Sequence, residues 1–224
     1  MSIMDEIRQR VIGMAAEAAM SEDPFSWFEE IYTSADGDWE MVPWEDNIPN
    51  PLFSDWLDCE TANLHDSGKA LVIGCGLGDD AAFLAKRGWE VTSFDISKTA
   101  VDWAQKIHFD LPINWVVADL LEPPKDWLGL FDLVVEIHIL QAMPQSLRDQ
   151  GAEILSTLVG NSGHLVCIGR ICEPEDENIG PPWPLTRAAI DSIGANMTQI
   201  EFIETKLPTD EEETRRYRAI WQKK

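Results

Sequence analysis

The stretch Val72-Ile73-Gly74-Cys75-Gly76-Leu77-Gly78-Asp79-Asp80 decides the fold. It continues a short apolar run over 70–73 and precedes a helical pattern over 81–87. Glycines directly after a strand permit a tight turn and let the backbone approach a ligand closely. Asp95 ends the next apolar run, over 90–94, where a carboxylate can accept hydrogen bonds from both hydroxyls of a ribose. This order of elements predicts a nucleoside-binding strand–helix–strand unit.

The spacing of the glycines separates two classes of nucleoside cofactor. A dinucleotide fingerprint would place its third glycine at the position of Asp79, so that a pyrophosphate can sit on the helix N-terminus. Here the third glycine, Gly78, comes one position early, and the pair Asp79 and Asp80 would repel a pyrophosphate. The same pair tolerates the ammonium and sulfonium groups of S-adenosylmethionine. The turn therefore favours a methyl donor, and NAD is the alternative.

Strand and helix patterns alternate outward from this unit. Ser97 is placed to cap the helix that follows the second strand. The alternation predicts one α/β domain, a doubly wound, mostly parallel seven-stranded sheet of Rossmann-like type with helices on both faces. The expected strands are 70–73, 90–94, 113–117, 131–137, 163–168 and a closing antiparallel pair, 200–206 and 215–221; the expected helices are 81–87, 97–108, 147–159 and 187–193.

A tryptophan-rich segment precedes the α/β pattern. Apolar residues at helical spacing predict a helix over 3–20, and 21–24 indicates a helix stop followed by a new start. The stretch 25–57 then carries Trp27, Tyr32, Trp39, Trp44 and Trp56. Such a density of large aromatics suggests a lid over a ligand, and the alternative is a cap that only covers the core. We therefore expect a helical N-terminal cap over 1–58 and an α/β core over 59–224.

The charge of the chain restricts its partners. Seventeen basic residues against 40 acidic ones give a formal net charge of −23 at pH 7, which repels phosphate backbones and anionic lipids. We expect neither nucleic acid nor a membrane as a partner. Charged residues interrupt the first 20 positions, and no apolar run approaches the roughly 20 residues of a membrane span. We expect a cytoplasmic monomer without a metal ion, with four reduced cysteines that lack C-x-x-C spacing.

Two proline-rich motifs narrow the family. They are Pro43-Trp44, followed by Pro49 and Pro51, and Gly180-Pro181-Pro182-Trp183. With them, the chain resembles class I methyltransferases and, more narrowly, the thiopurine, thiol and halide methyltransferase family. The glycine turn is common to the whole superfamily, whereas the two motifs are narrower. The resemblance extends from Trp27 to Trp221, and its other parts are 70–80, 88–97, Ala118-Asp119-Leu120 and 131–136.

The resemblance implies cofactor-binding roles for particular positions. The cofactor would be S-adenosylmethionine, and its methionine part would lie against Gly74, Gly76, Gly78 and Glu136. The adenosine would be held by Asp95 at the ribose, Ile96 beside the adenine, Asp119 at the adenine amino group and the Leu120 backbone. Trp27 and Trp44 match aromatic positions that close over the cofactor, and Ile31 and Tyr32 fall where a further aromatic is expected.

Some of these assignments have a structural alternative. Asp119 could simply cap a turn, because aspartate is common there. Trp27 and Trp44 could serve packing alone. Glu136 is harder to explain structurally, because an unpaired buried carboxylate is costly.

The resemblance also implies an enzyme that transfers a methyl group to a small-molecule acceptor, with S-adenosylhomocysteine as product. A methyl sulfonium is already activated, so the protein mainly has to align the nucleophile with it, which can be worth roughly 7–11 kcal/mol. A soft nucleophile such as a thiol, selenol, thiopurine or halide reacts as the anion and needs little base catalysis. The alternatives are a carboxylate or hydroxyl acceptor, and a protein that binds the cofactor without turnover.

Two side chains are candidates for the acceptor side of the site. His138 is the best placed to take a proton from a thiol, because histidine titrates near neutral pH; its alternative is a strand-end residue that contacts solvent or backbone. Arg170 could attract an anionic acceptor, and its alternative is a surface ion pair. Cys75 is expected to pack behind the glycine turn as a small apolar residue.

Overall fold

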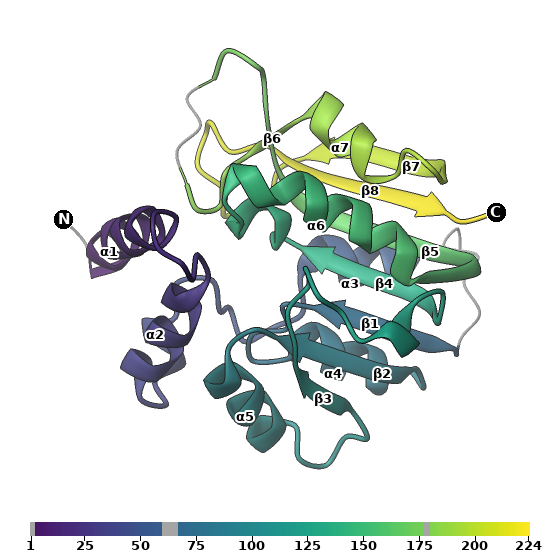
Figure 1. The fold of residues 1–224 in the computed structure, drawn as a ribbon, viewed down its shortest axis with the longest axis horizontal. Helices are drawn as coiled ribbons and strands as arrows, with labels where there is room; N and C mark the ends of the chain where they lie inside the picture. The colour runs from purple at the N-terminus through teal and green to yellow at the C-terminus, as the bar shows by residue number, and fades with distance from the viewer. Residues whose placement is uncertain (1–2, 60–66, 177–179) are drawn as a thin grey trace.

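A mostly parallel sheet forms the middle layer of the protein. The structure is a computed structural model, and it describes residues 3–59, 67–176 and 180–224 (Figure 1). The strand order is β3-β2-β1-β4-β5-β8-β7, and β8 runs antiparallel to both of its neighbours. This confirms the predicted seven-stranded α/β sheet. The strands are β1 (Lys69–Ile73), β2 (Glu90–Asp95), β3 (Asn114–Val117), β4 (Phe131–Ile137), β5 (Val159–Cys172), β7 (Thr198–Thr205) and β8 (Arg216–Gln222), with a two-residue β6 (Leu185–Thr186) beside β5.

Helices cover both faces of the sheet, because its central strands bury side chains on both sides. One apolar cluster packs α6 (Gln145–Leu158) and α7 (Arg187–Ile193) against the sheet. A second packs α3 (Pro51–Leu57) and α4 (Asp79–Ala85) on the opposite face. The α/β unit is completed by α5 (Lys98–Ile107) and the short turns η3 (Lys125–Trp127) and η4 (Leu140–Ala142).

The strand order reverses between β1 and β4. From β1 the chain proceeds through β2 to β3 on one side, and it then returns to β4 on the other side of β1. Ligands of open α/β sheets bind in the crevice that such a reversal leaves outside the carboxyl ends of the strands. The glycine turn, the end of β2 and the end of β4 all lie at this edge.

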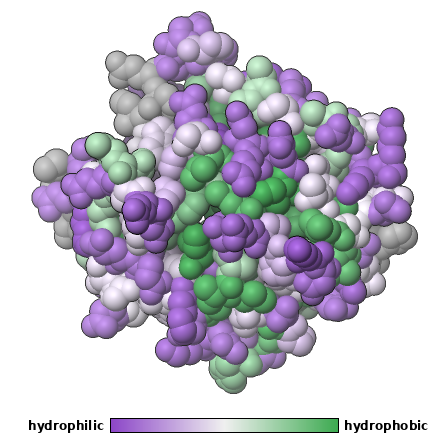
Figure 2. Space-filling model, in the orientation of Figure 1, coloured by the Kyte–Doolittle hydropathy of each residue, from purple (hydrophilic) through white to green (hydrophobic). Residues whose placement is uncertain are grey.

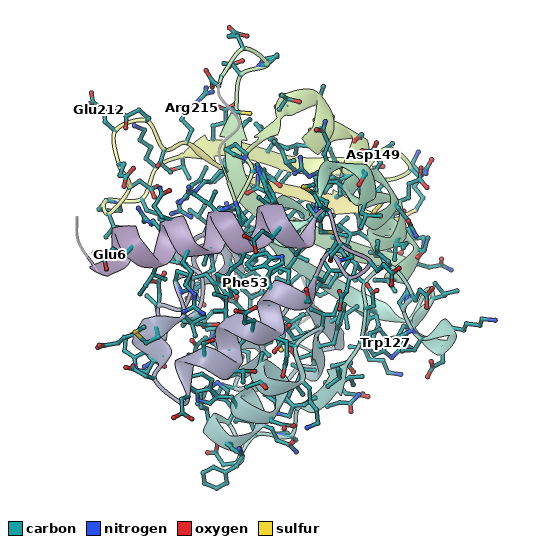
Figure 3. All side chains as sticks on the ribbon, turned by 60° about the vertical axis from the view of Figure 1, so that its left-hand side comes forward. Glu6, Phe53, Trp127, Asp149, Glu212 and Arg215 are labelled. Carbon is teal, nitrogen blue, oxygen red and sulfur yellow. The ribbon has the colours of Figure 1, made fainter. Side chains whose placement is uncertain are left out.

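The N-terminal cap lies across this same edge. It consists of α1 (Ile3–Ala18), α2 (Ser26–Ala35) and η1 (Trp39–Met41), and Figure 3 brings α1 and α2 to the front of the molecule. A third apolar cluster joins these helices to Leu77 in the glycine turn and to Ala100 in α5. The Trp-rich cap is thus present. Because α3 packs against the sheet, the expected division into 1–58 and 59–224 stays a prediction.

Most expected elements form within a few residues of their predicted bounds, and Ser97 caps α5 by accepting a hydrogen bond from Ala100 N. Two elements differ. The short helix α3 was not expected from its proline-rich surroundings, yet Pro51 occupies its first turn and Asn50 caps it. Strand β5 begins at Val159 rather than Gly163. Phe131 of β4 pairs with Val159 and Leu133 pairs with His164, so the pairing continues across a register shift.

Much of the surface is polar, in line with the content of charged residues (Figure 2). Figure 2 shows a largely hydrophilic face with hydrophobic side chains gathered near its middle. In the described parts of the chain, no helix combines the length and the apolar character that crossing a bilayer requires.

Candidate functional site

Asp95 is fixed at the end of β2 by the backbone around it. Its Oδ2 accepts a hydrogen bond from Gly76 N at 3.0 Å, and its Oδ1 accepts one from Ser97 N at 2.9 Å. The side chain is buried, and burial raises its pKa to about 6 although the backbone N–H groups oppose the shift. A carboxylate oxygen has two lone pairs, so each oxygen retains one for a ligand hydroxyl. The predicted ribose position therefore offers a rigid pair of acceptors.

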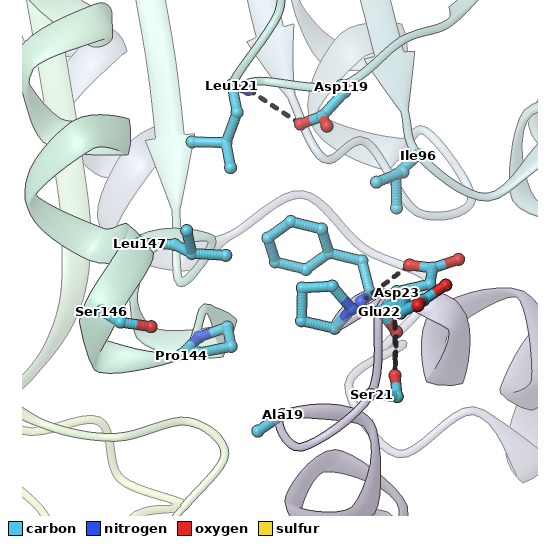
Figure 4. A pocket seen from close by; sticks show the side chains of 12 residues that line it. Ala19, Ser21, Glu22, Asp23, Ile96, Asp119, Leu121, Pro144, Ser146 and Leu147 are labelled. Carbon is cyan, nitrogen blue, oxygen red and sulfur yellow. Dashed lines mark hydrogen bonds between the residues drawn. The ribbon is translucent and has the colours of Figure 1, made fainter.

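An open cleft of about 660 Å³ reaches Ile96, the residue that follows Asp95. Ile96 and Asp119 line one side of it, and Pro144 and Leu147 line the other (Figure 4). The link between α1 and α2, residues 19–25, closes a further side. The cleft thus brings the two residues expected beside the adenine, Ile96 and Asp119, to one space.

Asp119 does two things in this cleft. Its Oδ1 accepts a hydrogen bond from Leu121 N at 2.8 Å, so it caps the turn after β3 as the structural alternative expects. It also lines the cleft, where its other oxygen is available to a donor. Leu120 is buried in the core cluster of α6 and α7, so only its backbone is suited to ligand contact. The adenine-binding roles of both residues stay predictions.

The aromatic residues of the cap form one contact group. Trp27 is buried, stacks on Phe28 with ring centroids 3.8 Å apart, and meets the edge of Trp44 at 5.9 Å. Trp44 is exposed to 39% and donates its indole N–H to the Tyr32 hydroxyl at 2.8 Å. Tyr32 is the further aromatic expected near this position, whereas Ile31 is a buried residue of the same apolar cluster.

A carboxylate that the sequence analysis missed joins these aromatics to the glycine turn. Glu45 Oε1 accepts hydrogen bonds from the Tyr32 hydroxyl and from Leu77 N, each at 3.1 Å. A Cβ added at Gly76, which has a φ of +52°, would lie 2.3 Å from the same oxygen. Only glycine therefore allows the cap to approach the turn this closely. The sequence signal was present, because Glu45 directly follows the Pro43-Trp44 motif.

A second cap carboxylate holds α2 on the start of α5. Glu29 accepts hydrogen bonds from the Ser97 hydroxyl at 2.6 Å, from the Thr99 hydroxyl at 2.6 Å and from Thr99 N at 3.1 Å. Burial raises the pKa of Glu29, but these hydrogen bonds outweigh that effect and the net pKa lies below the usual 4.5. Anionic acceptors at a helix N-terminus are also favoured by the helix dipole.

We expect Glu29→Gln to lower the free energy of unfolding by about 1–3 kcal/mol, because an amide cannot replace a carboxylate as the acceptor of three donors. Because the folded-state pKa is lowered, the contribution is present above pH 4.5 and is lost as the pH falls below it. Urea unfolding at pH 7 and pH 4 measures both effects. Glu30→Gln, at an exposed neighbour, is the control, and equal stability of the two variants at pH 7 would contradict this role.

Glu136 lies inside the core, beneath the turn that follows β4. Its Oε1 accepts a hydrogen bond from Leu140 N at 3.0 Å, while its Oε2 is buried and has no hydrogen-bond partner among the described residues. Burial raises its pKa to about 7. The turn carries Ile139, which packs directly over Gly74. Glu136 therefore supports a wall of the glycine turn, and its direct contact with the methionine end stays a prediction.

On the far side of this turn, three polar side chains form a connected network that is anchored to the backbone of Arg170. His138 Nδ1 lies 3.0 Å from Gln141 Oε1, and His138 Nε2 lies 3.3 Å from Arg216 Nη1. Gln141 Nε2 donates to Arg170 O, and Gln141 Oε1 accepts from Arg170 N at 2.8 Å. These bonds fix the Gln141 amide so that its oxygen faces His138, which then donates from Nδ1. The imidazole Nε2 is left to accept from Arg216.

The network explains the electrostatic state of His138. Burial lowers its pKa to about 4, and the nearby guanidinium groups of Arg216 and Arg170 add to the shift. Gln141 and Arg216, which connect the network, were not singled out in the sequence. Gln141 is almost completely buried and also accepts a hydrogen bond from Trp183 N, so it joins the end of β5 to the Gly-Pro-Pro-Trp motif.

Arg170 differs from Arg216 in its pairing. Arg216 makes a close ion pair with Asp210, with an N–O distance of 2.7 Å. In the described parts of the chain, no carboxylate lies within ion-pair distance of Arg170, and its buried Nε has no hydrogen-bond partner. Burial lowers the pKa of Arg170, the neighbouring Arg216 and Arg8 add to this effect, and the more distant charges of Asp210 and Glu211 partly oppose it. The arrangement can hold an anion.

The hydrogen-bond acceptors around the turn and the cleft suit S-adenosylmethionine. Carboxylates of Glu45, Asp95 and Asp119 lie at the glycine turn and the cleft, where they match a ribose, an adenine amino group and a cationic methionine part. In the described parts of the chain, no cluster of side chains that could hold a metal ion is present.

Comparison with solved structures identifies the fold. The N-methyltransferase NodS of Bradyrhizobium japonicum, solved in complex with S-adenosyl-L-homocysteine, matches with a TM-score of 0.63 at 14% identity, over 95% of this chain and 98% of that one. A SAM-dependent methyltransferase of Methanosarcina mazei matches with a TM-score of 0.64 at 15% identity, over 79% and 98% of the two chains. The fold is that of S-adenosylmethionine-dependent methyltransferases.

Sequence comparison then gives the family. The model of the thiopurine S-methyltransferase family matches residues 38–221, and the chain belongs to this family. "Probable thiol methyltransferase 2" of Arabidopsis thaliana is 28% identical over 81% of this chain and 80% of its own length. "Thiocyanate methyltransferase 1" of Brassica oleracea is 25% identical over 72% and 73% of the two chains. The protein is therefore an S-adenosylmethionine-dependent methyltransferase, which confirms the enzyme class and the cofactor expected from the sequence.

Proposed function

We propose that this methyltransferase transfers its methyl group to a small, soft, anionic nucleophile, such as a thiolate, selenolate, thiopurine or halide. The observation that carries the proposal is the half-buried guanidinium of Arg170, which has no ion-pair partner in the described part of a chain with a net charge of −23. A buried charge without a partner is costly, so an incoming anion gains from pairing with it. The names of the two relatives above, a thiol and a thiocyanate methyltransferase, support the same class of acceptor.

The position of Arg170 supports its role in acceptor binding. It lies in β5, and Gln141 ties it to the turn after β4, next to the strand reversal. Residues that follow β2 and β3 line one side of the cleft and the start of α6 lines the other, whereas Arg170 lies near the end of β5. A methyl group held between the cleft and Arg170 would face an acceptor beside Arg170. The charge of the rest of the surface favours a small molecule over a nucleic acid.

His138 then acts as a positioning residue rather than as a proton acceptor. The lone pair of its Nε2 faces Arg216, and burial holds its pKa at about 4, so the imidazole stays neutral at physiological pH. An acceptor that enters as an anion has no proton to lose. His138 instead orients Arg216 and Gln141, and these two residues define the space beside Arg170.

Catalysis by this chain is mainly a matter of orientation. S-adenosylmethionine supplies, when bound, a methyl group that its sulfonium has already activated. Asp95 and Asp119 would fix the adenosine, and the cap aromatics would exclude water from the turn. Arg170 would hold the acceptor in line. Such alignment lowers a barrier by up to about 7–11 kcal/mol.

An acceptor panel tests the proposal. The purified enzyme is supplied with S-adenosylmethionine and, in separate reactions, with a small thiol, a thiopurine, thiocyanate, iodide, a phenol and a carboxylate. Release of S-adenosylhomocysteine is the measurement. We expect the kcat/KM values of the anionic sulfur and halide acceptors to exceed those of the phenol and the carboxylate by at least about tenfold. Turnover confined to the hydroxyl or carboxylate acceptors would contradict the proposal.

A further inference from the structure

The glycine turn lacks an acidic residue on the strand that leads into it. β1 ends in Val72 and Ile73, which are buried apolar residues of the core. The methionine part of the cofactor nevertheless carries an α-ammonium group, and a cation in a water-poor site needs an acceptor. The carboxylates around the turn must come from other elements.

Glu45 is the carboxylate that reaches furthest over the turn. It comes from the cap, between η1 and α3, and its Oε1 binds Leu77 N and the Tyr32 hydroxyl. Both hydrogen bonds that described residues donate to the Glu45 carboxylate go to Oε1, so Oε2 is the oxygen that remains for a ligand. A Cβ added at Gly76 would lie 2.3 Å from Glu45 Oε1, so the carboxylate group lies directly on the turn.

Two of the other carboxylates nearby accept hydrogen bonds of their own. Both oxygens of Asp95 accept backbone hydrogen bonds, and its remaining lone pairs are those assigned to the ribose. Asp80 accepts a hydrogen bond from Asn50 N. Asp79 lies at the start of α4, 3.8 Å from His108 and without a hydrogen bond to it. Glu45, by contrast, accepts a hydrogen bond from Leu77 N in the turn itself, so it is the carboxylate best placed to meet a cation there.

We propose that Glu45, which the cap holds against the glycine turn, is the counter-charge for the α-ammonium group of the bound cofactor. The proposal rests on the established use of S-adenosylmethionine and is independent of the acceptor. The chain Trp44–Tyr32–Glu45–Leu77 connects the aromatic surface of the cap to the turn through three hydrogen bonds. The same carboxylate thus joins the cap to the turn and meets the ammonium group.

The charge state of Glu45 supports this role. Burial raises its pKa to about 8, and the negative charges of Asp79 and Asp95 add to the shift. The titratable groups that face it from neighbouring elements are Tyr32 from α2, Cys75 from the turn, Asp79 from α4 and Asp95 from β2. A cation beside Glu45 lowers its pKa, so binding of the ammonium at pH 7 releases a proton.

The test compares two ligands on two proteins by calorimetry. The ligands are S-adenosylhomocysteine and its deaminated analogue, in which hydrogen replaces the α-amino group. We expect Glu45→Gln to weaken binding of S-adenosylhomocysteine by at least about tenfold and to change binding of the analogue by less than about twofold. Glu40→Gln, an exposed glutamate of η1, is the control and leaves both affinities unchanged. Equal losses for both ligands, or no loss for either, would overturn the proposal.

A second measurement uses the unaltered protein, so it does not depend on how the variant folds. Titrations at pH 7 in buffers with different heats of ionisation give the number of protons released on binding. We expect S-adenosylhomocysteine to release more protons than the deaminated analogue. Equal release by the two ligands would contradict the assignment of Glu45. Either result leaves the acceptor panel unaffected, so a failure here is distinct from a failure of the proposed acceptor class.

Discussion

Asp95→Asn is expected to weaken binding of S-adenosylhomocysteine by more than about tenfold, because the amide loses the charge and one of the two acceptor oxygens. In the folded protein those oxygens also accept hydrogen bonds from Gly76 N and Ser97 N. An asparagine NH₂ would face one of these N–H groups, so the glycine turn itself would relax. Calorimetry at a temperature well below the melting transition of the variant measures the affinity.

The pH dependence of this binding has a definite direction. Burial raises the pKa of Asp95 to about 6, so affinity should fall as the pH drops through that value and the carboxylate becomes protonated. Asp102→Asn, on the exposed side of α5, is the matched control because the Asp102 side chain pairs with Lys98 and with no other residue that the structure describes. Unchanged affinity in Asp95→Asn would remove Asp95 from the cofactor site.

Arg170→Met is the second substitution with a large expected effect. It keeps the aliphatic stem and removes the guanidinium that has no carboxylate partner in the described structure. We expect kcat/KM for an anionic acceptor to fall by at least about tenfold, mostly through KM, while the affinity for S-adenosylhomocysteine changes by less than about twofold. Steady-state kinetics with iodide or a thiol, together with calorimetry, separate the two effects.

Arg215→Met is the matched control for this experiment. Arg215 directly precedes Arg216, the residue of β8 that pairs with Arg170 of β5, but its guanidinium faces Glu173 at 2.9 Å and two further carboxylates within 4 Å. Its replacement should leave acceptor kinetics unchanged. If Arg170→Met lost cofactor affinity as strongly as acceptor turnover, Arg170 would be a structural residue rather than the acceptor-binding group.

The positions of the glycine turn and of Asp95 in the fold could be predicted because their determinants are local in sequence. The glycine turn, Asp95 and the Ser97 cap all lie within 30 residues, and each depends on backbone geometry that its own residue type dictates. The same locality explains why the order of strands and helices was predicted correctly. Trp27 and Trp44 were recognised as cap residues, although their contact with the cofactor stays a prediction.

The rest of the site depends on contacts between distant parts of the chain. Glu45 meets Leu77 across 32 positions, and Arg216 meets His138 across 78. No periodicity reports such pairings, and a glutamine such as Gln141 carries no signal of its own in the sequence. The acidic loop 209–213 shows the same limit: its composition is typical of a solvent-exposed loop, but the Asp210 side chain is buried against Arg216.

The pairing of Asp210 with Arg216 connects the loop of the C-terminal hairpin to the network around His138. In the proposed site, this hairpin of β7 and β8 contributes to the acceptor half, whereas the cap and the ends of β1, β2 and β3 contribute to the cofactor half. Insertions or substitutions in one surface loop can therefore change which nucleophile is accepted without disturbing the methyl donor. Relatives that share the donor can diverge in substrate preference through this single segment.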